Sequence, residues 1–510
     1  NAACRSTPRL EGSSGLRPAS RTVHRRTSSR VTSIGVPRRF IHIQSEQNGM
    51  FSKQTYQARR AHLAHTVGTG LVLLPGHQSS PINFGANAYP FRQDSTFLYY
   101  GGPSSPGLAM VVDCDANDAF VCGCEAQPDD ALWSGPAPTL AAWAEAGGFD
   151  QVKSLDALGD LLAAAQRAGR PIHYLPDYRV DMTLTLARLL SIPARRVRAG
   201  VSHKLIATVV AQRAIKTDEE VAEIEVALGI CRTIFQEIAT IGLENQMPAG
   251  IMGRMAMVAF SRNSRFAFAP IVTPHGEILH GGVAAKPLKT NELLVVDVGV
   301  ESPRGYASDI TRTLPVGGRF DRRQRDIYEI VLKAQKTAIA AMAPGVRFRD
   351  VHLEAAGVIC QGLKEMGIMQ GDVEEAVAEG AHALFFPHGL GHMLGLDAHD
   401  MEALGEDHVG YDDETRRSRQ FGLAALRLGR RLESGFVVTV EPGIYFNRGL
   451  IEQWREAQRA AAFIDYGKLA AFDGFGGIRI EDDVLITDKA ARVLGPTIPK
   501  SVATIEASLT

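Results

Sequence analysis

The sequence predicts two folded domains of different class, an α/β domain over residues 50–212 followed by an α+β domain over residues 213–510. Two observations support this prediction. In the first part, short apolar runs bounded by Gly and Pro alternate with helical segments, the pattern of strands and helices packed in layers. In the second part, long amphipathic helices accompany apolar runs that read as antiparallel strands.

The first domain is predicted to contain a mixed or parallel sheet. One segment between its strands predicts a helix: SLDALGDLLAAAQRAG (154–169) spaces its leucines at helical intervals and stops at Gly169. The predicted buried strands are LVLLPG (71–76), AMVVDC (109–114), AFVCGC (119–124) and PIHYLP (171–176).

The character of the chain changes near residue 213. Thr217 is followed three residues later by Glu220, a capping box that begins a long amphipathic helix, so we place the domain boundary just before it. Downstream we expect an antiparallel hairpin and two single strands: ELLVVDVGV (292–300) with ASDITRTLPV (307–316), then FVVTVEPGIYF (436–446) and GGIRIEDDVLIT (476–487).

Composition describes an ordinary globular protein. The 510 residues are 45% hydrophobic and 22% charged with a formal net charge of −1, so nothing indicates nucleic acid or an anionic membrane as partner. No apolar run approaches the ~18 residues of a membrane span, and no apolar signal-peptide core is visible. We therefore expect a cytoplasmic protein.

Residues 1–49 differ from the rest of the chain. They hold nine Arg, no Lys, two Glu and twelve Ser or Thr, which is typical of an organellar transit peptide and would indicate a mitochondrial location. An alternative stays open, because Met50 begins a stretch that reads like a domain start, and residues 1–49 would then be an upstream translation. Either way we expect this segment to be disordered and leave it out of the fold.

Four acids interrupt apolar strands of the second domain: Asp297, Asp309, Glu441 and Glu481. Ionised carboxylates are almost never fully buried without compensation. The predicted hairpin can bring Asp297 and Asp309 face to face. The stretch FFPHGLGHMLGLDAHD (385–400) adds histidines, of which His392 is a candidate ligand. Asp482 and Asp483, beside Glu481, are expected to face solvent or to cap.

Two divalent cations explain this set. Four carboxylates and two M²⁺ ions come close to neutral, and oxygen-dominated ligation with one imidazole favours Mn²⁺, with Zn²⁺ or Co²⁺ as alternatives. Such a pair can deprotonate a water and polarise a carbonyl, which predicts a hydroxide nucleophile directed at an amide.

At this point the residues resemble those of a known family. The chain is similar to the proline-specific dinuclear metallopeptidases of the pita-bread fold, aminopeptidase P and prolidase. The resemblance implies an α+β pita-bread catalytic domain behind an aminopeptidase-P-type α/β domain. It is carried by YPFRQDSTFLYYGG (89–102), ILHGG (278–282), VVDVGVESPRGYASDITRT (295–313), PHGLGHMLGLDAHD (387–400), TVEPGIYF (439–446) and GGIRIEDD (476–483).

The resemblance also implies roles for single residues. The five matching metal ligands, of which Asp309 and Glu481 would touch both ions, are Asp297, Asp309, His392, Glu441 and Glu481. Glu441 would also serve as general base. His280 would hold substrate and stabilise the oxyanion, and His399 would contact the peptide around the scissile bond. His388 and Arg479 would orient ligands from behind.

The same resemblance leaves the substrate length open. Aminopeptidase P removes the first residue of a longer peptide with proline second, and the YPFRQDS segment favours it. Prolidase accepts only the dipeptide and must bind its carboxylate, and Arg427, in FGLAALRLGRRLESG (421–435), falls where prolidase places the arginine that does so. A solvated arginine is the alternative interpretation of Arg427.

Two further expectations follow from the family. Trp133 corresponds to an aromatic that family oligomers place near the neighbour's active site, so a homodimer or homotetramer is expected, although a simple core or surface tryptophan is the alternative. An inactive pita-bread relative acting as a binding module is the other class of function considered. Such relatives lose ligands, whereas all five are present here.

Overall fold

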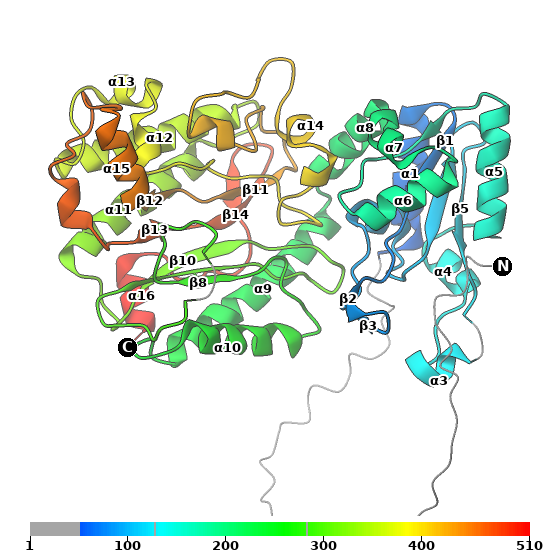
Figure 1. Ribbon diagram of the computed structural model, residues 1–510, viewed down its shortest axis with the longest axis horizontal. Helices are drawn as coiled ribbons and strands as arrows, with labels where there is room; N and C mark the ends of the chain where they lie inside the picture. Colours follow the sequence, from blue (N-terminus) through cyan, green and yellow to red (C-terminus); the bar gives the residue numbers. More distant parts are fainter. Residues whose placement is uncertain (1–50, 127–128, 282–283, 510) are drawn as a thin grey trace, which may run out of the picture.

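The computed structural model describes residues 51–126, 129–281 and 284–509. The prediction for residues 1–49 lies outside the described residues. We call residues 51–214 the N-terminal region and residues 215–509 the C-terminal region. The two lie side by side in Figure 1, with the N-terminal region in blue to teal and the C-terminal region in green to red.

The N-terminal region contains a five-stranded mixed sheet in the order β6-β5-β4-β1-β7. All four predicted strands are in it, and β6 was not predicted. Parallel pairing joins β1 to β7 and β5 to β6, and the other neighbours are antiparallel. The elements are α1 (Lys53–Val67), β1 (Leu71–Pro75), β2 (Pro81–Phe84), β3 (Asn87–Ala88), α2 (Ser95–Gly101), β4 (Ala109–Asp113), β5 (Asp118–Gly123), α3 (Asp130–Ser134), α4 (Leu140–Ala146), β6 (Gln151–Ser154), α5 (Leu155–Arg167), β7 (Ile172–His173), α6 (Val180–Leu189), α7 (Ala194–Val197) and α8 (His203–Ala214).

Helices cover both faces of this sheet. Leu71 and Leu73 of β1 belong to a core shared with α5 and α6, whereas Val72 and Leu74 belong to the core shared with α1 and α2. Alternate residues of a strand point to opposite faces, so a strand that is apolar throughout needs cover on both sides. The predicted helix is confirmed as α5, which begins after the N-cap Ser154.

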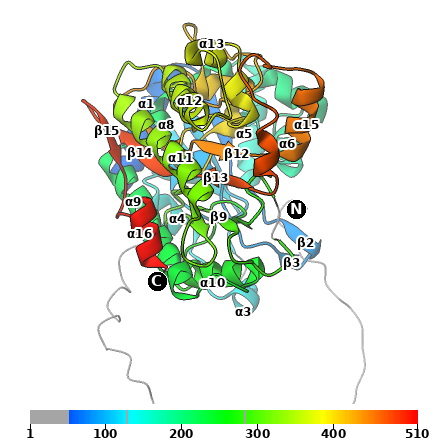
Figure 2. The same cartoon turned by 90° about the vertical axis from the view of Figure 1, so that its left-hand side faces the viewer.

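The C-terminal region places small sheets between two helical layers. Figure 2 shows α10 below the strands and α12 above them. The sheets are β10-β9-β8, β11-β14-β15 and β12-β13. The elements are α9 (Asp218–Thr240), α10 (Pro248–Phe260), β8 (Ile271–Thr273), β9 (Leu293–Val298), β10 (Ile310–Pro315), α11 (Arg322–Ala341), α12 (Phe348–Glu365), α13 (Val373–Ala378), α14 (Glu406–Gly410), β11 (Val437–Val440), β12 (Gly443–Tyr445), α15 (Arg448–Glu456), β13 (Gly477–Arg479), β14 (Asp482–Ile486), β15 (Ala491–Val493) and α16 (Val502–Ser508).

The predicted capping box and hairpin are both confirmed. The Thr217 side chain accepts from the Glu220 backbone N–H while Glu220 bonds back to Thr217, and α9 begins there. Strands β9 and β10 pair antiparallel with Asp297 opposite Thr311. Among the described helices, none combines the length and apolarity needed to span a bilayer.

The prediction of single strands at 436–446 and 476–487 is wrong in one respect, because each of them is divided into two strands. Glu441 lies between β11 and β12, and Glu481 lies between β13 and β14. A residue in the middle of a ladder directs its side chain straight out of the sheet, whereas a break frees the backbone to turn. The breaks therefore allow both acids to leave the sheets and reach a common centre.

A buried histidine pair, His352 and His382, packs beside Phe386. His352 of α12 and His382 are both fully buried, their rings are 6.0 Å apart, and none of their four ring nitrogens has a hydrogen-bond partner among the described residues. Burial lowers the pKa of His352 to about 3 and that of His382 to about 4. Both are therefore neutral in the folded chain at neutral pH.

Because of this pair, we expect the free energy of unfolding to decrease as the pH falls. The unfolded histidines titrate near pH 6.5, so below that pH the unfolded chain binds protons that the folded chain refuses. The free energy of unfolding should decline by up to ~1.4 kcal/mol per pH unit and per histidine between about pH 6.5 and 4. His352→Phe, which can pack on Phe386, should reduce this slope by about one proton in thermal unfolding from pH 7 to 5. An unchanged slope would contradict it.

Candidate metal centre

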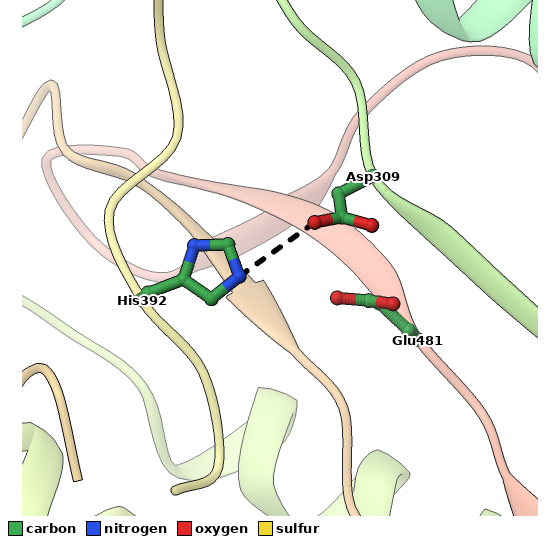
Figure 3. Close-up of side chains that lie close together, drawn as sticks. All are labelled: Asp309, His392 and Glu481. Carbon is green, nitrogen blue, oxygen red and sulfur yellow. Dashed lines mark ion pairs between the residues drawn. The ribbon is translucent and has the colours of Figure 1, made fainter. Parts of the chain in front are cut away.

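Three predicted ligands from separate segments converge on one point. Asp309, immediately before β10, His392, from the loop before α14, and Glu481, in the β13–β14 break, offer ligand atoms that all lie within 4.8 Å of one another. Figure 3 shows the two carboxylates and the imidazole turned toward the same space. His392 Nε2 is 3.6 Å from an Asp309 carboxylate oxygen, and all three side chains are buried.

The His392 loop is held against β11. The His392 N–H donates to Thr439 Oγ1, and the Thr439 and Glu441 N–H groups donate to carbonyls of the loop. A Cβ on Gly391 would lie 2.0 Å from the Thr439 carbonyl oxygen, so only glycine permits this approach. His392 Nδ1 is 3.0 Å from the Met393 carbonyl and must donate to it, which leaves the Nε2 lone pair for a metal.

Asp297 and Arg479 form the second part of the centre. An Arg479 guanidinium N–H donates to Asp297 at 2.5 Å, and further Arg479 N–H groups donate to Thr311 and Tyr445. The Tyr445 hydroxyl in turn donates to Nε2 of His388, whose Nδ1–H is bonded to the Gly389 carbonyl. The two residues expected to orient ligands therefore belong to one hydrogen-bonded group. Tyr445, which completes it, was not predicted.

Glu441 completes the set of acids. Its carboxylate oxygens lie 3.8 Å from His392 Nε2 and 3.8 Å from His388 Nδ1. Burial raises the pKa of Glu441 to about 7, and burial together with the neighbouring carboxylates raises the pKa of Asp309 and of Glu481 well above their ordinary values. Four acids so close together repel one another, and only cations between them make full ionisation favourable.

Asp482 and Asp483 do not face solvent, and that expectation is wrong. Asp482 is buried and accepts from Arg312 at 2.7 Å, with Lys500 on its other oxygen. Asp483 is 0% exposed and accepts the Asp309 N–H at 3.0 Å. β14 is the central strand of the sheet β11-β14-β15, and its successive residues Asp482 and Asp483, which point to opposite faces, are both buried, so both faces are covered. Asp483 thereby fixes the backbone that carries Asp309.

One cavity of about 990 Å³ contains nearly all of the predicted site. His280 and His399 lie on its wall, and the His399 ring is 4.2 Å from the His392 ring. Trp133 lies elsewhere, on α3, where it is 84% exposed, so it is not a core residue. The predicted residues that line the cavity are Asp297, Asp309, His392, Glu441, Glu481, His280, His388, His399, Arg427 and Arg479.

Arg427 lines the cavity and lies close to two acidic side chains, Glu402 and Glu406. Its Nε donates to Glu402 at 3.1 Å and lies 3.5 Å from Glu406. Glu402 also accepts from His399 Nδ1 at 2.5 Å. Glu402 was not predicted, although its position three residues after His399, in a segment that forms a short helical turn, is a signal that could have identified it.

The residues present suit divalent cations. One carboxylate oxygen of Asp297 and one of Asp309 are buried without any hydrogen-bond partner among the described residues. Buried acceptors left without a donor are costly, and a cation removes that cost. Carboxylate oxygens with one imidazole nitrogen are the donors that Mn²⁺ and related ions bind.

Comparison with known proteins shows the family to which the chain belongs. The family model described as "Metallopeptidase family M24" matches residues 194–488, and the one described as "Aminopeptidase P, N-terminal domain" matches residues 56–173. A probable Xaa-Pro aminopeptidase of Aspergillus clavatus is 30% identical, over 86% of this chain and 92% of its own. Human Xaa-Pro dipeptidase is also 30% identical, over 82% of this chain and 84% of its own.

The fold agrees as well. The structure of an Escherichia coli aminopeptidase P variant in complex with substrate superimposes with a TM-score of 0.73 at 26% identity, covering 90% of this chain and 98% of the other. Fold and site thus define a metal-dependent peptidase with an aminopeptidase-P-type N-terminal domain. The chain belongs to metallopeptidase family M24. The predicted fold class, an α+β catalytic domain behind an α/β domain, is confirmed.

Proposed function

We propose that the protein removes the N-terminal residue from peptides whose second residue is proline. The observation that supports this most directly is the convergence of Asp309, His392 and Glu481, from three separate segments, inside a cavity of about 990 Å³. The relatives named for Xaa-Pro peptide bonds support the substrate class. An X–Pro bond is a tertiary amide without an N–H, which calls for a dedicated site.

The metal centre is proposed to hold two divalent ions, with Mn²⁺ favoured. Its ligands would be Asp297, Asp309, His392, Glu441 and Glu481. Bound there, the ions would supply Lewis acidity toward the scissile carbonyl and make a water acidic enough to react at neutral pH.

The chain's own groups would handle the proton and the peptide. Glu441, whose carboxylate lies 3.8 Å from His392 Nε2, would take a proton from the attacking water and pass it to the proline nitrogen. His280, exposed at the cavity wall, would donate to the developing oxyanion. His399 would contact the peptide beside the scissile bond, while His388 and Arg479 hold their partners in place.

The test of this function compares two substrates. Gly-Pro-Ala should release free glycine and leave Pro-Ala intact, and Gly-Ala-Ala should not be cleaved at a comparable rate. Product identification by mass spectrometry with Mn²⁺ present settles the point. Internal cleavage, or equal rates on the two tripeptides, would refute the proposal.

Dipeptidase activity is the second candidate, because Arg427 reaches the cavity. An arginine fork at that wall could bind the carboxylate of a dipeptide. Turnover of Gly-Pro with no turnover of Gly-Pro-Ala would favour this function over the first.

A homo-oligomer is also proposed. Trp133 and its neighbour Leu132 are both largely exposed, and large apolar side chains in such a position suit contact with a second copy.

We also propose a boundary between the two domains just before Thr217, and a cytoplasmic location.

A further inference from the structure

The surroundings of Arg427 bear on which substrates the cavity accepts. Two arginines line it, Arg427 and Arg479. Arg479 is buried and bound to Asp297, Thr311 and Tyr445. Arg427 is about one-third exposed, so it is the arginine of this cavity that an incoming carboxylate could meet.

Arg427 is already paired with a carboxylate of the chain, however. One oxygen of Glu402 accepts both from Arg427 Nε at 3.1 Å and from His399 Nδ1 at 2.5 Å. Glu402 lines the same cavity and its side chain is 39% exposed. The hydrogen bond from His399, with the charges of His399 and Arg427, lowers the pKa of Glu402 to about 2, so Glu402 is ionised at neutral pH.

This arrangement works against a substrate carboxylate. The Arg427 Nε–H is already engaged, which removes one side of the guanidinium fork from bidentate binding. The Glu402 charge cancels that of Arg427 and stands next to any carboxylate that approaches it, and like charges in contact are unfavourable. A chain that continues as an amide after proline carries no charge there and meets no such opposition.

We infer that Glu402 is a specificity-determining residue that disfavours dipeptides with a free proline carboxylate and directs the enzyme to longer peptides. The inference rests on the proposed function, since it concerns which Xaa-Pro substrates the same site accepts. It assigns Arg427 the role of positioning Glu402 and His399 rather than of binding the end of the substrate.

The experiment compares Gly-Pro with Gly-Pro-amide, which differ only in the terminal charge. The measured quantity is the ratio of kcat/KM for the acid to that for the amide. In Glu402→Gln, which keeps an oxygen to accept from His399, this ratio should rise about tenfold or more over the unmodified chain. Adding Arg427→Met to Glu402→Gln should abolish the gain, because the arginine is then no longer present to bind the carboxylate.

Glu406→Gln is the matched control. Glu406 lies 3.5 Å from Arg427 Nε but is bound at 2.7 Å to Arg417 and does not line the cavity. Its removal takes away the same charge nearby and should change the ratio by less than about twofold. A second measurement needs no variant: raising the salt concentration should raise the ratio of the unmodified chain, since salt screens the repulsion.

The outcomes distinguish a failure of the inference about Glu402 from a failure of the proposed function. A ratio in Glu402→Gln that stays the same or falls would overturn the role of Glu402, as would a gain of equal size in Glu406→Gln. Absence of glycine release from both Gly-Pro-amide and Gly-Pro-Ala by the unmodified chain would instead refute the proposed function. A rise of the acid-to-amide ratio in Glu402→Gln, together with glycine release from Gly-Pro-amide by the unmodified chain, supports both.

Discussion

Asp309→Asn is expected to lower kcat/KM for Gly-Pro-Ala at least about a thousandfold. Groups that only orient metal ligands typically cost 10–100-fold when changed, and a ligand that touches both ions should cost more. Asp309 lies in the tightest part of the centre, with His392 and Glu481, and an amide there offers one neutral oxygen in place of two charged ones. The measurement is steady-state kinetics with excess Mn²⁺.

Asp297→Asn is the control for this prediction. It makes the same chemical change on the neighbouring strand β9, where the Asp297 carboxylate also accepts a hydrogen bond from Arg479. Its loss should be smaller than that of Asp309→Asn, and circular dichroism should show both variants folded. Equal losses in the two variants would contradict the assignment of Asp309 as the carboxylate shared between the ions.

Exhaustive dialysis against EDTA is expected to leave less than about 1% of the activity, and added Mn²⁺ should restore it. The reason is electrostatic as well as catalytic. Without cations, burial and mutual repulsion raise the pKa of Asp309 and Glu481 well above their ordinary values and that of Glu441 to about 7. The carboxyl groups of the metal-free site are therefore partly protonated, whereas they must be ionised to bind the metal ions.

The same shifts predict how the metal-free chain responds to pH. Acids whose folded pKa lies above the unfolded value stabilise the fold below the unfolded pKa, and that stability is lost as pH rises through the folded pKa. These acids should therefore lower the free energy of unfolding of the metal-free chain, relative to that of the Mn²⁺-loaded chain, as the pH rises from about 4.5 to 7. His352 and His382 affect both forms alike, so thermal unfolding of the two forms across this range isolates the effect of the acids as the difference between them.

Much of the fold could be predicted because local signals agree with it. The capping box at Thr217, the glycine stop of the helix ending near Gly169 and the apolar strands each specify their own element. Asp297 and Asp309 could be brought together from sequence because a hairpin joins them over a short distance.

What could not be predicted depends on packing between distant segments. The strand breaks at Glu441 and Glu481 arise where the chain must turn toward the centre. Pro442 and Gly443 are a sequence signal for the first break, whereas no glycine or proline marks the second.

Asp483 looked solvent-facing because an acid in a strand usually is, yet it is fully buried and accepts the N–H of Asp309, the residue just before β10. Of the two partners of Glu402, His399 lies three residues away in the same segment and could have been inferred, whereas Arg427 lies on another segment and was visible only in three dimensions.

The number of divalent ions bound per chain tests the central claim most directly. Titration of the EDTA-treated protein with Mn²⁺, followed by calorimetry and elemental analysis, should give two ions per chain for the unmodified sequence and fewer for Asp309→Asn. A metal-free chain that binds no ion, or one that keeps full activity without any, would contradict the account.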